Sequence, residues 1–302
     1  MARCRSNALS RSSPFLLWLS LALYGAQSQP LTILQPQQLM EAGSNLGPGA
    51  AQELEAQLEK NPEDLAARAK LIGYYYYQWM QPGEAAAKAG RRKHILWLIE
   101  HHPDSPILNL AEVPIEDTGN SLADPEGYKQ ARQLWLSQME ARKSDAYTLA
   151  NLAKFFQMTD KNLAESALLQ AKALQPQNAQ WDWQLGYLYG MGVLGVDALG
   201  LNGQPTSVDP IAASGPFAVK SRKALAESRS PTMLAIAAQI LWRYGTMLAP
   251  TATGKLDWLD ESAKLIQQAK MAEPNNPAWP QFLAQIAAYR QQVVSPAPKL
   301  VK

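Results

Sequence analysis

Residues 145–191 decide the fold and read DAYTLANLAKFFQMTDKNLAESALLQAKALQPQNAQWDWQLGYLYGM. Ala, Leu and Gln dominate this stretch, and its apolar residues recur at helical spacing. Unbranched side chains lose little rotamer freedom on a helix, so this composition favours helix over strand. We therefore predict helices over 145–158, 161–174 and 179–191, separated by short turns.

The junctions between these helices recur along the whole chain. A helical pattern ends, a proline follows within a residue or two, and another amphipathic pattern begins. This occurs at 58–62, 100–103, 173–176 and 271–274, and a variant without proline occurs at 141–145. Self-similarity at intervals of roughly 30 to 45 residues is the signature of helical repeat proteins.

Several helix starts share one design. In Asn61-Pro62-Glu63-Asp64 a capping side chain precedes a proline, and acidic residues follow near the positive end of the helix dipole. Asp124-Pro125-Glu126, Ser230-Pro231 and Asn276-Pro277 repeat the cap and the proline. The recurrence predicts several helix N-termini of the same kind.

Residues 144–191 resemble tetratricopeptide repeats. The aromatic, small and closing-proline positions of that family are occupied by Phe155 or Phe156, Ala164, Leu168, Ala171 and Pro176, and its Leu-Gly-x-x-Tyr pattern by Leu185, Gly186 and Tyr189. Asp182 stands at the family's Trp position, which is a departure. Gly73 and Tyr76, and later Ala263, Ile266, Ala269 and Pro274, continue the resemblance in weaker form.

The resemblance implies an all-α, right-handed α-solenoid of about five helix-turn-helix pairs. We assign this solenoid to residues 50–292, with a flexible leader over 29–49 and a disordered tail over 293–302. Further helices are expected over 50–60, 63–80, 84–101, 125–142, 217–228, 231–248, 257–272 and 278–292. Residues 104–123 and 192–216 are long loop insertions whose apolar residues should pack against the helices.

Residues 1–28 have the pattern of a signal peptide. Arg3, Arg5 and Arg11 precede the apolar run FLLWLSLALYG at 15–25, and Ala26-Gln27-Ser28 offers a small-x-small cleavage site. The apolar run is shorter than the roughly 20 residues that span a bilayer, which disfavours the alternative of an uncleaved anchor. We expect cleavage near Ser28/Gln29, export to a periplasm or the extracellular space, and no membrane insertion afterwards.

Charge and cysteine content narrow the function classes. Without the three arginines of 1–28, basic residues fall one short of the 26 acidic residues, so no nucleic-acid partner is indicated. The single cysteine, Cys4, lies in the same segment, which leaves no disulfide and no thiol nucleophile. His94, His101 and His102 lack a completing ligand, and no phosphate-binding glycine loop occurs, so we expect no metal and no cofactor.

The candidate binding residues come from the family resemblance, which implies a concave groove lined by the first helix of each pair. In the registers set by Gly73 and Gly186, and in a middle repeat whose register can slip by one residue, this groove shows Lys70, Tyr74, Tyr77, Gln78, Lys154, Gln157, Met158, Trp183, Tyr187 and Met191. Rigid aromatic anchors with polar tips suit recognition surfaces. Packing between neighbouring helices is the alternative role for the same aromatic residues.

The leading interpretation is a non-catalytic exported scaffold that binds a protein or peptide. The alternative is an exported helical enzyme acting on a cell-wall or other carbohydrate polymer, with Glu112 or Glu116, beside Asp117, as catalytic acids. Glu165-Ser166 repeats a pair used by superhelical lytic transglycosylases, but the Gly-Leu-Met-Gln stretch of those enzymes is missing, and we expect Glu165 to be solvated. Oligomeric state is left open.

Overall fold

The computed structural model describes residues 34–79, 84–118, 123–200 and 204–295. All described residues belong to one compact unit of the chain, 31–302. The predicted signal peptide over 1–28, and residues 296–302 of the predicted tail, lie outside the described residues. Residues 293 and 294 belong to the last helix.

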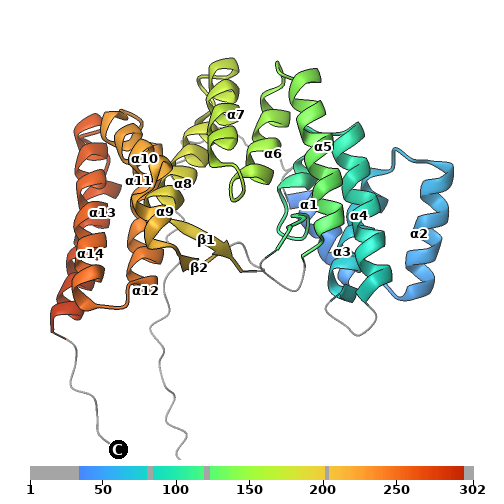
Figure 1. Cartoon of the computed structure of the whole chain (residues 1–302), viewed down its shortest axis with the longest axis horizontal. Coiled ribbons are helices and arrows are strands. Elements are labelled where there is room, and N and C mark those ends of the chain that lie inside the picture. Colours follow the sequence, from blue (N-terminus) through green and yellow to red (C-terminus); the bar gives the residue numbers. More distant parts are fainter. Residues whose placement is uncertain (1–33, 80–83, 119–122, 201–203, 296–302) are drawn as a thin grey trace, which may run out of the picture. The chain divides into compact units, whose positions relative to one another are not determined.

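The described residues are predominantly helical, so the prediction of an all-α chain is confirmed at that level (Figure 1). The helices are α1 (Leu34–Ser44), α2 (Pro48–Lys60), α3 (Leu65–Trp79), α4 (Glu84–His101), α5 (Pro125–Ala141), α6 (Ala146–Phe156), α7 (Lys161–Leu174), α8 (Ala179–Leu194), α9 (Pro210–Ser214), α10 (Pro216–Glu227), α11 (Pro231–Ile240), α12 (Thr246–Leu248), α13 (Ala252–Ala272) and α14 (Ala278–Val294). Two short strands, β1 (Val196–Leu199) and β2 (Pro205–Val208), pair antiparallel.

Of the four predicted capping residues, Asp124 and Ser230 are the N-caps of α5 and α11. Asn276 binds the first amide of α14 from one residue before its N-cap, Pro277. Asp124 accepts a hydrogen bond from the amide of Gly127 (3.1 Å), Ser230 from that of Met233 (3.2 Å), and Asn276 from that of Ala278 (3.0 Å). The prediction was wrong at Asn61, which instead ends α2. Helix α3 begins later, and the carboxylate of Asp64 caps it.

Helix α1 corrects the predicted flexible leader. Residues 34–44 are helical and pack against α3, and Met40 is fully buried. The two helices touch through glycines. A Cβ at Gly43 would lie 2.0 Å from the carbonyl oxygen of Lys70, and a Cβ at Gly73 would lie 2.1 Å from that of Met40. The glycines allow the backbones to meet, which no larger residue would permit.

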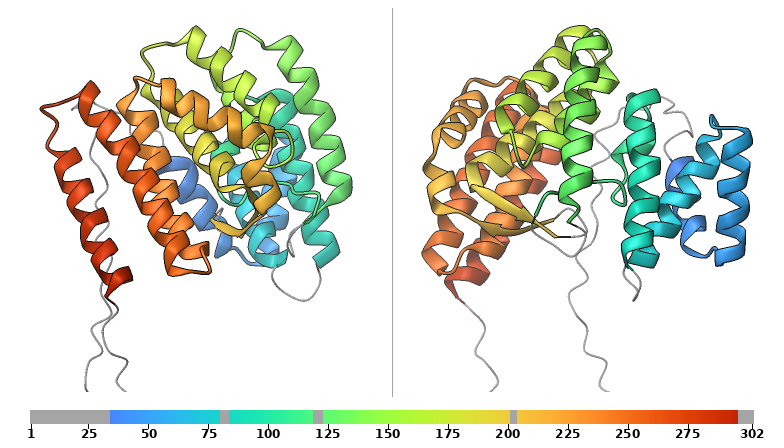
Figure 2. Two further views of the ribbon diagram at one scale, coloured as in Figure 1. Left: turned by 60° about the vertical axis from the view of Figure 1, so that its left-hand side comes forward. Right: turned by 45° about the vertical axis from the view of Figure 1, so that its right-hand side comes forward.

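Most helices pack against a helix close to them along the chain. The main contacts join α3 to α4, α4 to α5, α6 to α7, α7 to α8, α8 to α11, α11 to α13 and α13 to α14. Figure 2 shows α13 and α14 side by side at the C-terminal end of this series. Gly186 of α8 lies against the backbone of Met233 in α11, where a Cβ would come within 2.5 Å of a carbonyl oxygen. The missing side chain at Gly186 therefore allows α8 and α11 to approach closely.

Both predicted loop insertions pack against the helices where they are described. The first contains the short 3-10 helix Pro106–Asn109, and Ile107, Leu108 and Val113 are buried. In the second, α8 extends to Leu194, and Gly195 then adopts a positive φ of 68° before the β1–β2 hairpin. Residues 119–122 and 201–203 of these insertions lie outside the described residues.

The predicted single helix over 231–248 is interrupted. Residues Leu241–Gly245 form a π-helical segment between α11 and α12. Gly245 faces the ring of Trp258, where a Cβ would lie 2.7 Å from a ring carbon. The wider turn therefore occurs where the helix meets a bulky side chain of α13, which is a recognised cause of such irregularities.

Candidate partner-binding cavity

The first loop insertion, helices α4 to α8 and the β1–β2 hairpin enclose a cavity of about 730 Å³. Its lining includes side chains from the loop (Leu108, Asn109, Val113, Ile115, Glu116, Asp117), from α5 and α6 (Tyr128, Trp135, Lys154, Phe155), from the α6–α7 turn (Gln157, Met158, Thr159), and from α8 and β1 (Gln180, Trp183, Gln184, Tyr187, Leu188, Asp197, Leu199). The volume falls within the range of natural ligand sites, which is roughly 300–1,000 Å³.

Buried polar side chains hold the loop in place on one side of the cavity. Asn151 of α6 donates to the carbonyl oxygens of Pro103 (2.8 Å) and Ser105 (3.0 Å). Arg91 of α4 donates to the carbonyl oxygens of Glu112 (2.8 Å) and Pro114 (2.6 Å). These bonds give side-chain partners to carbonyl groups of the loop where it packs on the helices. The loop wall is therefore anchored to two helices.

Two aromatic pairs form parts of the wall. Trp183 and Tyr187, one turn apart on α8, stack with ring centroids 5.7 Å apart and an interplanar angle of 9°. Tyr128 of α5 and Phe155 of α6 stack at 5.1 Å and 17°. Trp183 is 44% exposed. The stacked rings therefore offer a ligand a rigid aromatic surface.

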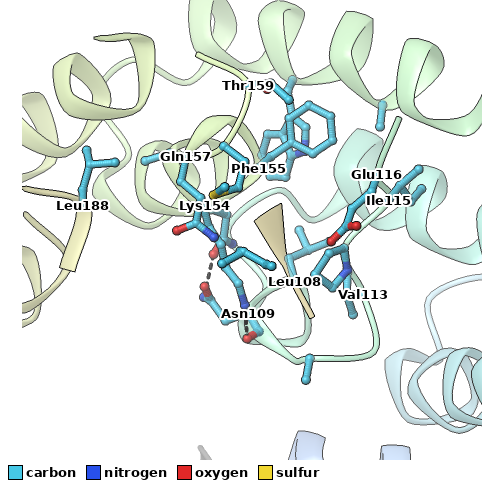
Figure 3. Close-up of a pocket in the computed structure, with 18 of the residues that line it drawn as sticks. Leu108, Asn109, Val113, Ile115, Glu116, Lys154, Phe155, Gln157, Thr159 and Leu188 are labelled. Carbon is cyan, nitrogen blue, oxygen red and sulfur yellow. Dashed lines mark hydrogen bonds between the residues drawn. The ribbon is translucent and has the colours of Figure 1, made fainter. Parts of the chain in front are cut away.

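Lys154 is the cationic side chain on the described lining. Its amine donates a short hydrogen bond to the carbonyl oxygen of Asn109. Figure 3 shows the two residues beside each other on the cavity wall. Asn109 is itself fixed by a 2.6 Å hydrogen bond to Asn151. Burial lowers the pKa of Lys154 to about 8, and nearby Glu112 partly opposes this shift. The amine is thus costly to keep charged in this position.

The acidic residues of the loop separate into two environments. Glu116 and Asp117 line the cavity, as does Asp197 of β1, which accepts a 2.6 Å hydrogen bond from Ser207. Glu112 lies outside the lining and is 6% exposed, and its Oε2 has no hydrogen-bond partner among the described residues. Of the acids proposed from sequence, Glu116 and Asp117 can therefore meet a ligand in the cavity.

The predicted binding residues fall into two groups. Lys154, Gln157, Met158, Trp183 and Tyr187 come together on the cavity wall. Met191 is 2% exposed and lies in the core of α8. Lys70, Tyr74, Tyr77 and Gln78 belong to α3 and lie outside the lining; Tyr74 packs against the Leu58–Leu71 core, Tyr77 packs beside Tyr76 and Trp79, and α1 covers the backbone of Lys70. The groove predicted from α3 is thus separate from this cavity.

Sequence reasoning missed Tyr128, Asn109 and the hairpin residues as parts of the site. Tyr128 lies on the first turn of α5, three residues after Pro125, and no local pattern distinguishes it from a surface tyrosine. The loop residues enter the site only because Asn151 and Arg91 fix the loop against α6 and α4. Such long-range contacts leave no periodic signal.

A second polar cluster joins α2, α3 and α4, and we call Glu55, Arg68, Tyr75, Lys93 and His94 the α2–α4 polar cluster. Glu55 accepts hydrogen bonds from Tyr75 (2.8 Å), Lys93 (2.8 Å) and the Nε2 of His94 (2.9 Å). Arg68 lies 3.3 Å from the Nδ1 of His94. Arginine can only donate, so Nδ1 accepts and Nε2 carries the hydrogen.

Glu165 corrects a further expectation. It is 2% exposed rather than solvated, because α8 and α10 cover this part of α7. Its carboxylate accepts a 2.9 Å hydrogen bond from Tyr189 and forms a short ion pair with Lys220. The carboxylate raises the pKa of Tyr189, after burial itself. Glu165 therefore links three helices and lies outside the cavity lining.

The described ranges lack two other kinds of feature, a metal-binding cluster and a membrane-spanning helix. No group of three or more His, Cys, Asp or Glu side chains in them is placed to hold a metal ion. None of the helices described there combines the length and hydropathy needed to cross a bilayer.

Comparison with known proteins gives no relative from which to transfer a function. No protein-family model matches the chain. No curated protein matches it at a significant level.

Proposed function

We propose that this chain is a non-catalytic binding protein that holds a peptide segment of a partner in the cavity between α4–α8 and the β1–β2 hairpin. The observation that carries the proposal is the half-exposed Trp183–Tyr187 stack on the wall of a cavity of about 730 Å³. Binding energy at protein interfaces concentrates in such rigid aromatic anchors.

The polar part of the wall suits a peptide backbone. Gln157, Gln180 and Gln184 line the cavity, and each amide side chain can both donate and accept a hydrogen bond. A peptide group offers the same two functions. Phe155 and Met158, which are partly exposed, supply apolar surface on the same lining. The combination of amides and apolar patches supports an extended or helical segment as the occupant.

We further propose that the helices form a solenoid of tetratricopeptide type and that residues 1–28 direct export, with the mature chain beginning near Gln29. The packing of most helices on neighbours close in sequence supports the solenoid. Analysis of the N-terminus of the protein recovered outside the cytosol tests the export proposal. A chain that retains residues 1–28 there would contradict cleavage.

The binding proposal is tested by capturing partners from an extract of the producing cell's envelope and medium with the chain from Gln29 onward. The Trp183→Ala/Tyr187→Ala variant should lose the partner. Tyr147→Ala is the matched control. The exposed fraction of Tyr147, 47%, is similar to the 44% of Trp183, but Tyr147 lies outside the lining. A partner retained equally by all three proteins would contradict binding in the cavity.

One observation favours an enzyme as the second candidate. Glu116 and Asp117 share the cavity with the aromatic stack, and carboxylates beside aromatic rings are also found where carbohydrate is hydrolysed. The enzyme would require Glu116→Gln/Asp117→Asn to abolish turnover of a cell-wall polymer. The binding proposal expects no turnover by either the unaltered chain or the variant.

A further inference from the structure

We propose that the occupant of the cavity is a basic peptide segment, whose arginine or lysine side chains meet the acids of the loop and hairpin and the face of Trp183. This inference rests on the proposed function and specifies the chemistry of the partner.

The charge of the wall is the first argument. Glu116, Asp117 and Asp197 line the cavity, whereas Lys154 is the one cationic residue on the described lining. Asp117 and Asp197 are exposed. Acids beside apolar walls create a local negative potential that is stronger than the same charges on an open surface. A cationic ligand is therefore attracted and an anionic one repelled.

The guanidinium of Arg91, which lies outside the lining, is close enough to Glu116 to attract its charge, whereas the nearby lysines do little to offset Asp117 and Asp197. The amine of Lys154 is directed at the carbonyl oxygen of Asn109, and buried Glu112 lies close enough to influence its charge. Lys161, which is close to Asp197, donates to the carbonyl oxygen of Val196 (3.3 Å) and lies outside the lining. Both amines are thus held by the backbone of this chain.

The aromatic stack is the second argument. Tyr187 covers one face of Trp183, and Trp183 remains 44% exposed. A guanidinium or ammonium group over a Trp face gains a cation–π interaction, and Arg also stacks on it. The described residues use this contact three times. Arg68 lies 3.3 Å from the ring centroid of Trp97, and Lys88 and Arg91 lie 4.8 Å and 5.3 Å from that of Trp79. An external arginine can use Trp183 in the same way.

Apolar residues indicate that the segment is amphipathic. Phe155, Met158 and Leu199 are partly exposed and line the same cavity as the acids. A segment in which basic and apolar residues alternate satisfies both kinds of surface. A uniformly basic segment would leave the apolar wall in contact with water.

The test is selection from a displayed library of random short peptides on the chain from Gln29 onward. Parallel selections use Trp183→Ala/Tyr187→Ala and Glu116→Gln/Asp117→Asn/Asp197→Asn, with thermal unfolding to verify that each variant is folded. We expect peptides enriched in Arg, Lys and apolar residues on the unaltered chain alone. An enriched peptide, measured by calorimetry, should bind the acid-to-amide variant at least about 10-fold more weakly, and this difference should shrink at high salt.

The other outcomes separate the two proposals. Enrichment of acidic or uncharged peptides that depends on Trp183 and Tyr187 would overturn the basic partner and leave the binding function standing. Basic peptides that bind all three proteins equally would show attachment outside the cavity and overturn the inference. Absence of any peptide that distinguishes the unaltered chain from the Trp183→Ala/Tyr187→Ala variant would overturn both.

Discussion

The α2–α4 polar cluster and the cavity region both hold polar side chains away from water. They differ in how many hydrogen-bond partners those side chains have. In the cluster, Glu55 is contacted by three donors and His94 uses both ring nitrogens. In the cavity region, Lys154 contacts a single carbonyl oxygen and Glu112 keeps an oxygen without a described partner. The first arrangement is closed to further ligands, whereas the second has both space and unsatisfied polar capacity.

This difference indicates which polar groups stabilise the fold and which serve binding. A fully satisfied buried network strengthens and specifies packing, while a partly satisfied one costs stability. Proteins retain such costs mainly where function needs them. Under the proposed binding function, the contrast groups His94 with the residues that stabilise the fold and Lys154 with those of the cavity.

The largest effect is expected for Glu55→Ala. This change leaves Tyr75, Lys93 and buried His94 without their common acceptor, and we expect a loss of about 3 kcal/mol in the free energy of unfolding. Urea unfolding measures it. Glu53→Ala, an exposed position on the same helix, is the control and should change stability by less than about 0.5 kcal/mol. A loss as small as the control's would show that the cluster is not a stabilising network.

The pH dependence of stability should follow from the same cluster. Burial alone would raise the pKa of Glu55, but hydrogen bonds from His94, Lys93 and Tyr75 outweigh it and lower the pKa to about 2. Burial lowers the pKa of His94, against the opposing influence of Glu55. Both folded-state pKa values thus lie below the unfolded ones, so the stability they contribute is present above about pH 6.5 and is lost on acidification toward pH 2.

Thermal unfolding between pH 7 and pH 3 checks this prediction. The double variant Glu55→Gln/His94→Gln lacks both titrating groups, and its stability should fall by about 1–2 kcal/mol less than that of the unaltered chain over this range, after allowance for partial exposure of Glu55. Glu53→Gln should follow the unaltered chain. Parallel curves for all three proteins would contradict the pKa directions.

Lys154→Met should raise the free energy of unfolding, in contrast to Glu55→Ala, which should lower it. Because the folded-state pKa of about 8 lies below the ordinary value, the charged amine costs stability at pH 7, and this cost disappears as the pH rises from 8 to 10.5. We expect the variant to be about 1 kcal/mol more stable at pH 7, with no gain above pH 10.5. Lys143→Met, at an exposed position, should be near neutral. A destabilised Lys154→Met would place Lys154 with the structural residues.

The smallest change in stability is expected for Trp183→Ala. Trp183 is 44% exposed and touches mainly Tyr187, so its removal should cost less than about 1 kcal/mol in urea unfolding while it weakens peptide capture. A loss comparable to that of Glu55→Ala would mean that the stack belongs to the core.

The sequence predicted the helices best where local signals agree. For α6 and α7 the apolar spacing and the following polar turn place the ends within two residues, and Asp145 and Asp160 cap both helices. Helix α1 was misjudged for a physical reason. Gly43, which looked like a flexible position, is the residue that allows the backbone of α1 to meet α3. Glycine occurs both in flexible linkers and at close backbone contacts, so its presence alone does not distinguish the two.

The candidate site was predictable in part. Trp183 and Tyr187 share a helix face at a spacing of four, so their proximity follows from periodicity, and Lys154 and Gln157 follow from the same argument on α6 and the turn after it. The loop wall was not predictable. Its position depends on Asn151 and Arg91, whose partners lie more than twenty residues away in sequence.

The reciprocal glycine contact between α1 and α3 also sets a limit on where the chain can be trimmed. A chain that starts at Pro48 would keep every other described helix but lose α1. The space that Met40 fills would be left open, and the backbone of Lys70 and Gly73 would be exposed. Such a fragment would expose apolar surface on α3 and tend to self-associate. A protease site or fusion junction introduced for laboratory work should therefore lie before Leu34, even though residues 29–49 read as a dispensable linker.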